Sequence, residues 1–257
     1  MAEPRLVVDR LSVRRGPRVV VDAVSFAAPA GALTVLLGPN GAGKSTVLKA
    51  LCGLLPYDGA VRIDGGDVRA LDRRARARTV AYVPQHSALD APLPVRDVVL
   101  QGRFAHGTGL GTPTAADRAA ADAAMERTDL VALAERPFNT LSYGERRRVL
   151  VGRALATGAR VLLLDEPTAA LDVGHALALL AVLRAVAAEG AAIVLVLHQL
   201  QEAAACAEHA VLLDGGRRVA AGPVAEVIAA GPVRAVYGVE LVAAAQFACR
   251  LPAEEAP

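Results

Sequence analysis

Apolar runs of strand length alternate along this chain with stretches that have the spacing of helices. The runs are almost wholly apolar, which is typical of strands buried on both faces of a sheet. The strand-like runs are 33–37, 80–83, 161–164 and 193–197, and the helical stretches are 44–51, 72–78, 141–155 and 171–188. Because strands and helices alternate, the pattern predicts an α/β protein with a mostly parallel sheet.

The first segment, from Arg5 to about Ile63, also has a second kind of pattern, around the run 33–37 and the stretch 44–51. It contains short strand-like runs separated by turn signals, which favours an antiparallel sheet beside the parallel one. The runs are 6–8, 19–21 and 24–26, and the turn signals are Gly16-Pro17 and 29–31.

A departure from the alternation of strands and helices extends from residue 91 to about 140. Pro92 and Pro94 open it, and an alanine-rich helical pattern follows at 114–133, where Thr114 and Asp117 have the spacing of an N-terminal capping box with a shorter acid. A glycine-rich loop with Gly107, Gly109 and Gly111 interrupts it. We interpret this stretch as a helical insertion.

These patterns predict one large domain over residues 1–242. Its core and antiparallel β-subdomain are expected in 1–90 and 156–242, and a helical subdomain in 91–155. Residues 243–257 are rich in Ala, Glu and Pro and are expected to form a C-terminal tail that frays.

Residues 38–46 form the complete G-x-x-x-x-G-K-[ST] pattern of a nucleotide phosphate loop, or Walker A motif. The loop lies between a predicted strand and a predicted helix, where free backbone N–H groups and the helix dipole favour phosphate. Lys44 offers a point charge to the β- and γ-phosphates, and the Ser45 hydroxyl is a ligand for Mg²⁺. We expect every residue of the loop to bind nucleotide: Gly38, Pro39, Asn40, Gly41, Ala42, Gly43, Lys44, Ser45 and Thr46.

The apolar run 161–164 ends in Asp165-Glu166-Pro167, which is the pattern of a Walker B motif. At the carboxyl end of the strand, Asp165 is placed to hold Mg²⁺, and Glu166 to act as the general base toward an attacking water. A strand that merely ends in acidic turn residues is the alternative. Two adjacent carboxylates are, however, a costly way to end a buried strand.

Composition narrows the class of protein. The chain has 257 residues, is 54% hydrophobic and carries a net charge of +2, without the basic run or aromatic-interleaved patch of a nucleic-acid binder. Its 3 cysteines fit neither a disulfide framework nor a metal site, which favours a reducing compartment. We expect no membrane span, because no uninterrupted apolar stretch reaches about 18 residues, and no secretory signal, because the first residues lack an apolar core.

A third motif lies between the two Walker motifs. Leu141-Ser142-Tyr143-Gly144-Glu145 precedes a helical run, and a Ser and a Gly at a helix N-terminus make a second phosphate-binding end. Taken alone it is an ordinary capped helix. In this order the motifs resemble the ATP-binding cassette (ABC) family, whose signature is Leu-Ser-Gly-Gly-Gln. Tyr143 and Glu145 replace a glycine and the glutamine of that signature, while Ser142 and Gly144, which the resemblance places on the γ-phosphate, remain.

The resemblance implies a P-loop NTPase with a RecA-like core, a flanking antiparallel β-subdomain and a helical insertion subdomain. It also implies further site residues for ATP and Mg²⁺. Gln85 resembles the glutamine that senses Mg²⁺ and the attacking water, and His198 the switch histidine that contacts the γ-phosphate. Asp172 resembles the D-loop residue that bridges two subunits. The usual aromatic platform for adenine is absent, and Arg15 is expected to stack on the base instead.

In this family two cassettes meet head to tail around two ATP molecules. A chain with one set of motifs is therefore expected to form a homodimer with C2 symmetry. Transport then requires separate integral membrane permease subunits, served indirectly by a binding protein, with the cassette peripheral on the cytoplasmic face of the inner membrane. The segment after Gln85 and the helical insertion are expected to form the groove for the permease.

Three local sequences resemble those of cassettes from metal-chelate importers, which carry ferric siderophores, haem or cobalamin: 98–103 with His106, 172–175, and 236–239. These residues can equally be packing positions shared by many cassettes. Two other functions stay open: the cassette of an amino-acid or lipid transporter, and a non-transport ATPase such as one for cluster assembly. A P-loop kinase would lack the signature.

Overall fold

The strands of the chain form two sheets that lie side by side. A computed structural model describes residues 4–87, 89–107, 112–169 and 171–239. In this part of the chain one sheet is 4-stranded, with the order β2-β1-β4-β5, and the other is 6-stranded, with the order β10-β9-β3-β8-β7-β6. The first consists of β1 Pro4–Arg15, β2 Arg18–Pro29, β4 Asp58–Ile63 and β5 Gly66–Asp67. The second consists of β3 Ala32–Leu37, β6 Val80–Val83, β7 Val161–Asp165, β8 Ala192–Val196, β9 His209–Asp214 and β10 Arg217–Pro223.

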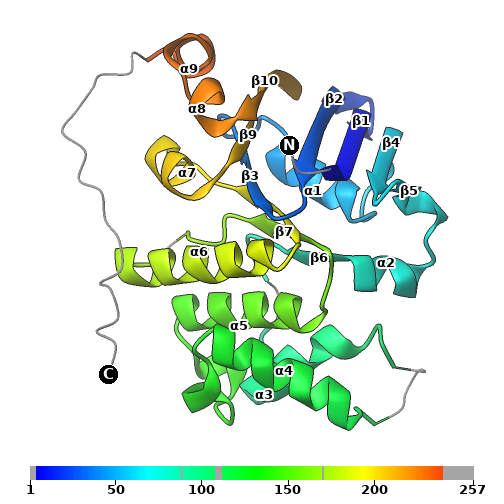
Figure 1. The fold of residues 1–257 in the computed structure, drawn as a ribbon, viewed down its shortest axis with the longest axis vertical. Coiled ribbons are helices and arrows are strands. Elements are labelled where there is room, and N and C mark those ends of the chain that lie inside the picture. The colour runs from blue at the N-terminus through cyan, green and yellow to red at the C-terminus, as the bar shows by residue number, and fades with distance from the viewer. Residues whose placement is uncertain (1–3, 88, 108–111, 170, 240–257) are drawn as a thin grey trace.

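The α-helices fall into three groups along the chain (Figure 1). Helices α1 Lys44–Leu51 and α2 Arg73–Thr79 come first, and α3 Val95–Leu100, α4 Ala115–Arg127 and α5 Tyr143–Ala156 form the second group. Helices α6 Val173–Ala188, α7 Leu200–Cys206, α8 Val224–Val227 and α9 Ala230–Tyr237 follow. Short 3-10 turns lie at Val68–Ala70, Gln101–Arg103, Val131–Leu133 and Phe138–Thr140. Figure 1 shows α3, α4 and α5 gathered on one side of the molecule, below α6.

The larger sheet is parallel from β9 to β6, and only β10 pairs antiparallel, with β9. Its central strands β3, β7 and β8 are buried at every residue. Such strands read as continuous apolar runs because both of their faces are covered. The prediction of a mostly parallel sheet with an antiparallel sheet beside it is therefore confirmed.

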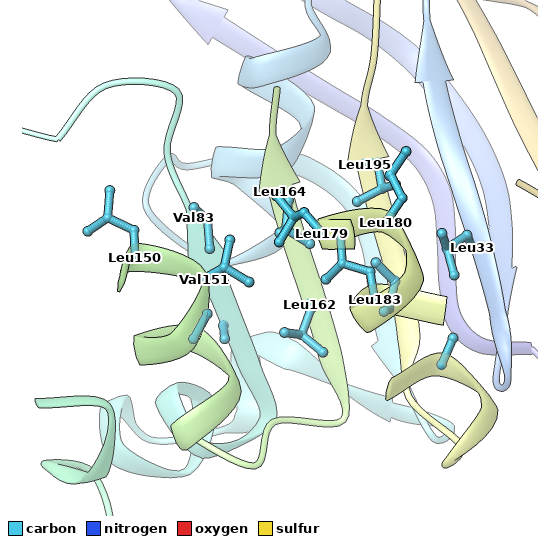
Figure 2. Packing of buried hydrophobic residues seen from close by; sticks show 14 of the residues in the cluster. Leu33, Val83, Leu150, Val151, Leu162, Leu164, Leu179, Leu180, Leu183 and Leu195 are labelled. Carbon is cyan, nitrogen blue, oxygen red and sulfur yellow. The ribbon is translucent and has the colours of Figure 1, made fainter. Parts of the chain in front are cut away.

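Successive residues of β7 point into different cores, as the two-residue period of a strand requires. Leu162 and Leu164 belong to the core that α5 and α6 cover, whereas Val161 and Leu163 belong to the core shared with α1 and the antiparallel sheet. Figure 2 shows Leu162 and Leu164 facing side chains of α5 and α6, among them Val151, Leu179, Leu180 and Leu183. The sheet is thus packed on both faces, and its functional groups must lie at a strand end.

Two predicted boundaries were wrong. The runs 19–21 and 24–26 form one strand, β2, whose pairing with β1 is irregular and in which Ala23 has a φ of 48°. A bulge absorbs the break in the apolar pattern without ending the strand. The pattern at 114–133 also ends early, because α4 stops at Arg127 and Asp129 turns the chain with a φ of 53°. The capping box of Thr114 and Asp117 is present as predicted.

Some predictions lie outside the described residues. These are Gly109 and Gly111 of the glycine-rich loop, Ala170 beside the D-loop, Cys249 and the tail 243–257. Within the described chain, no helix combines the length and the apolar character needed to cross a bilayer.

Candidate functional site

The parallel sheet brings four sequence motifs to one edge. Strands β3, β8, β7 and β6 are consecutive neighbours, and all four run in the same direction. The phosphate loop follows β3, His198 follows β8, Asp165 ends β7 and Gln85 follows β6. Ligands of open α/β sheets bind outside the carboxyl ends of the strands, so this edge is the candidate site.

The phosphate loop is shaped by glycines at positions that a side chain cannot occupy. Gly38 has a φ of 142°, and a Cβ there would lie 2.1 Å from the carbonyl oxygen of Leu213. Gly41 and Gly43 have φ values of 82° and 96°. A residue with a Cβ would be strained in these conformations, so the loop requires glycine for its shape.

Lys44 folds back over the loop that precedes it. Its Nζ donates to the carbonyl oxygens of Gly38 at 2.7 Å and Pro39 at 2.9 Å. Burial lowers the pKa of the ammonium, and the Glu166 and Asp165 carboxylates oppose this shift. The Lys44 ammonium group is thus held inside the loop, at the start of α1.

Ser45 and Asp165 form a pair of oxygen ligands. The Ser45 hydroxyl donates to Asp165 Oδ1 at 3.0 Å, and the Tyr82 hydroxyl donates to Asp165 Oδ2 at 3.4 Å. Burial raises the pKa of the Asp165 carboxyl, and the hydrogen bond from Ser45 counters part of this shift. A hydroxyl and a carboxylate beside a phosphate loop are the hard donors that Mg²⁺ prefers, so these residues fit the cation.

Glu166 is held by a partner on each carboxylate oxygen. Gln85 Nε2 donates to Glu166 Oε2 at 2.7 Å, and His198 Nε2 lies 2.5 Å from Glu166 Oε1. The Glu166 backbone has a φ of 52°, which is uncommon for a residue with a Cβ. The structure thus brings together the three residues that the sequence analysis proposed for hydrolysis.

The signature segment forms the N-terminus of α5. Ser142 is the N-cap, its hydroxyl accepts from the Glu145 backbone N–H at 3.3 Å, and Glu145 Oε2 accepts from the Ser142 N–H at 2.7 Å. This reciprocal pair is a capping box, in which Glu serves as well as Gln. The departure at Glu145 therefore preserves the helix end. Gly144 packs closely on the D-loop, because a Cβ there would lie 3.0 Å from Leu171 Cδ2.

Two other predicted residues are not joined to this cluster. Asp172 caps α6, where it accepts from the His175 N–H at 2.9 Å and contacts His175 Nδ1 at 2.5 Å. Arg15 is exposed at the end of β1. Neither contacts the phosphate loop or the carboxylates within this chain.

The sequence 98–103 with His106 has a structural role at the far end of α5. A Cβ on Gly102 would lie 2.2 Å from the Arg153 carbonyl oxygen, so the 3-10 turn Gln101–Arg103 approaches α5 closely there. Arg103 Nη1 donates to the Ala156 carbonyl oxygen at 3.0 Å, and His106 Nε2 lies 2.8 Å from that of Thr157. Such groups satisfy the last carbonyls of a helix. The packing interpretation thus accounts for this run.

Two residues of the site were not predicted from the sequence. Tyr82 lies on the predicted strand 80–83, but its bond to Asp165 depends on the pairing of β6 with β7. Arg147 lies in the helical run after the signature; it is 2% exposed and donates to the carbonyls of Gln85 and of Pro167, which follows Glu166. Neither has a local sequence signal, because both contacts join segments far apart in the chain.

A pocket of about 170 Å³ adjoins the Gln85 side of the site. It lies between the segment after β6 and the first turns of α5. Its lining residues are Gln85, His86, Ser87, Leu89, Phe138, Tyr143, Arg146, Arg147 and Leu150.

Known proteins share this sequence and fold. Residues 21–169 match the ABC transporter family. The chain is 43% identical to a hemin import ATP-binding protein of Rhodococcus jostii, covering 91% of this chain and 80% of that protein. It is 35% identical to an iron(3+)-hydroxamate import ATP-binding protein of Bacillus subtilis, covering 91% and 88%.

A solved structure agrees in fold. An inward-facing ABC transporter of the metal-chelate type superposes with a TM-score of 0.81 at 27% identity, covering 93% of this chain and 90% of that one. The fold predicted from the sequence, a P-loop core with a β-subdomain and a helical insertion, is therefore confirmed. The chain belongs to the ABC transporter family, as one of its ATP-binding and ATP-hydrolysing subunits.

Proposed function

We propose that this chain powers the uptake of a metal chelate, namely an iron–siderophore, haem or cobalamin, through separate membrane subunits of a bacterial importer. The observation that carries the proposal is the joining of Gln85, Glu166 and His198 at one sheet edge, in a chain 43% identical to a hemin import ATP-binding protein. The similarity to an iron(3+)-hydroxamate import protein supports the same cargo class.

The phosphate loop 38–46 binds the phosphates of ATP. Its N–H groups and Lys44 Nζ supply positive charge where the β- and γ-phosphates lie. Ser45, Gln85 and Asp165 would hold Mg²⁺, whose charge neutralises the phosphate oxygens when it is bound. Arg15 stacks on the adenine, since a guanidinium can take the place of an aromatic ring.

Glu166 takes the proton of the attacking water. Its carboxylate is held by Gln85 and His198, so it is already oriented before water arrives. A base with a fixed position lowers the barrier because less reorganisation is needed in the transition state. His198 contacts the γ-phosphate and Gln85 orients the water.

One chain supplies half of each site. Ser142 and Gly144 begin a helix whose N–H groups can cover a γ-phosphate, yet they make no contact with the phosphate loop of their own chain. A second copy related by C2 symmetry would supply them, with Asp172 bridging the subunits. ATP closes this homodimer and hydrolysis reopens it.

The permease would dock on the pocket between Gln85 and α5, which has one wall from the core and one from the helical subdomain 91–155. The cassette then lies on the cytoplasmic face of the inner membrane, and a binding protein acts only through the permease. We expect the chain not to bind nucleic acid. In this proposal residues 1–90 and 156–242 form the core with the β-subdomain, and residues 91–155 form the helical subdomain.

Uptake by a deletion strain tests the cargo. A strain that lacks this gene should fail to use one of three supplied chelates, hemin, a ferric hydroxamate or cobalamin, and the intact gene should restore uptake. Normal uptake of all three would reject the cargo class. Co-purification with soluble assembly proteins, and not with membrane subunits, would favour a cluster-assembly ATPase, while failure of amino-acid or lipid transport would favour the other transporter classes.

A further inference from the structure

Arg147 is a buried arginine that no part of the mechanism above uses. It lies in the second turn of α5, and only 2% of it is exposed. In the described part of the chain no carboxylate lies within ion-pair distance of it, and its hydrogen bonds all go to backbone carbonyls. A buried charge without a carboxylate partner needs several hydrogen bonds to be tolerated.

The guanidinium bonds two segments of the catalytic edge. Its Nη1 donates to the carbonyl oxygens of Pro84 and, at 3.2 Å, Gln85. Its Nη2 donates to the Asp165 carbonyl, and its Nε to that of Pro167 at 3.3 Å. These carbonyls belong to the ends of β6 and β7, so one side chain of α5 fixes two strand ends.

The carbonyls of Asp165, the last residue of β7, and of Pro167 flank Glu166. Asp165 precedes it and Pro167 follows it, while Glu166 itself has a φ of 52°. An unfavourable backbone conformation persists only where neighbouring contacts fix it. Arg147 supplies such contacts on both sides, and it also holds the backbone of Gln85, whose side chain donates to Glu166.

Arg147 also lines the pocket between the segment after β6 and α5. If a molecule in that pocket displaced α5, the Arg147 guanidinium would transmit the displacement to the backbone at Gln85 and beside Glu166. Lysine could not replace it, because an ammonium on a flexible stem lacks the planar fork that spans four carbonyls.

We propose that Arg147 is a positioning residue that fixes the Glu166 carboxylate relative to Gln85 and couples both to α5. This rests on the proposed function, in which Glu166 is the base and Gln85 orients the water.

The test compares Arg147→Lys with Arg148→Lys in the full-length chain. Arg148 is its neighbour on α5 but bonds Asp129, away from the site. Arg147→Lys is expected to lower kcat for ATP hydrolysis by about 10- to 100-fold, the scale of a small displacement of reacting groups. Its affinity for a fluorescent ATP analogue should stay near the parental value, and Arg148→Lys should keep the parental kcat.

A double variant separates positioning from general structural damage. If Arg147 acts through Gln85, then Arg147→Lys combined with Gln85→Ala should lose little more activity than the worse single variant. The proposal would be overturned if the kcat losses of the two single variants multiplied in the double variant. It would also be overturned if Arg147→Lys kept the parental kcat, or if its affinity for the ATP analogue fell in step with kcat. If Arg147→Lys does not fold by circular dichroism, Arg147→Gln is measured by the same criteria. Absence of hydrolysis by the parental chain would instead reject the proposed function.

Discussion

Replacing Glu166 by Gln tests the centre of the proposed mechanism. The two side chains have the same shape, so the change removes basicity and leaves the packing in place. The amide oxygen can still accept from Gln85 Nε2, which lies 2.7 Å from the carboxylate in the parental chain. The amide N–H can donate to a neutral His198, whose Nε2 lies 2.5 Å from the other oxygen.

The expected loss is that of a general base alone. Removing such a group lowers a rate by roughly 10²- to 10⁴-fold. At about 1.4 kcal/mol for each factor of ten, this is about 3–5 kcal/mol of activation free energy. Nucleotide binding should change by less than about 1 kcal/mol, because the phosphate loop and Lys44 are untouched.

The assay is phosphate release under steady state, with affinity for a fluorescent ATP analogue measured separately. Size-exclusion chromatography with ATP should show the variant accumulating as a dimer, because it binds nucleotide but does not hydrolyse it. Glu189→Gln is a matched control, since Glu189 pairs with Arg127 at the opposite edge of the sheet. Hydrolysis by Glu166→Gln at the parental rate would refute its assignment as the base.

Three further changes test other parts of the structure. Ser142→Ala should cost about 1 kcal/mol of unfolding free energy through loss of the N-cap, and in a mixed dimer it should lower hydrolysis at the partner's site; unchanged hydrolysis there would contradict the shared site. Gly102→Ala should cost roughly 1–3 kcal/mol in a denaturant titration because of overpacking against α5, whereas Gly107→Ala, with open space around it, should be nearly neutral; equal effects would reject the close helix contact. Asp165→Asn should raise the Tm of the nucleotide-free chain at pH 8. Burial raises the pKa of Asp165 in the folded chain, so the cost of its ionised carboxylate is fully present above that raised pKa. The gain from Asn should shrink as the pH falls through the raised pKa toward the unfolded value; a lower Tm at pH 8 would contradict it.

Much of the local structure follows from short-range sequence. The helix that begins at Lys44 and the capping boxes at Thr114 and Ser142 are set by residues within one turn. The errors lie where a tertiary contact overrides a local pattern. The pairing of β2 with β1 carries the strand through Ala23, and Asp129 turns the chain after Arg127. The residues that stabilise the backbone conformations of Ala23 and Asp129 lie outside the local sequence pattern around each of them.

The chemistry proposed for each motif follows from residue types at short spacing. Glycines at 38, 41 and 43, the lysine that follows them, and the adjacent carboxylates of 165 and 166 carry their roles in residue type and spacing. Which of these motifs meet depends on the tertiary structure. The order β3-β8-β7-β6 places His198 and Gln85 on opposite sides of Glu166, and the packing of α5 on the sheet places Arg147 beneath them. Strand pairing and helix packing join segments well beyond one helical turn, from a separation of 20 between 147 and 167 to one of 81 between 85 and 166, and no short-range rule specifies such partners.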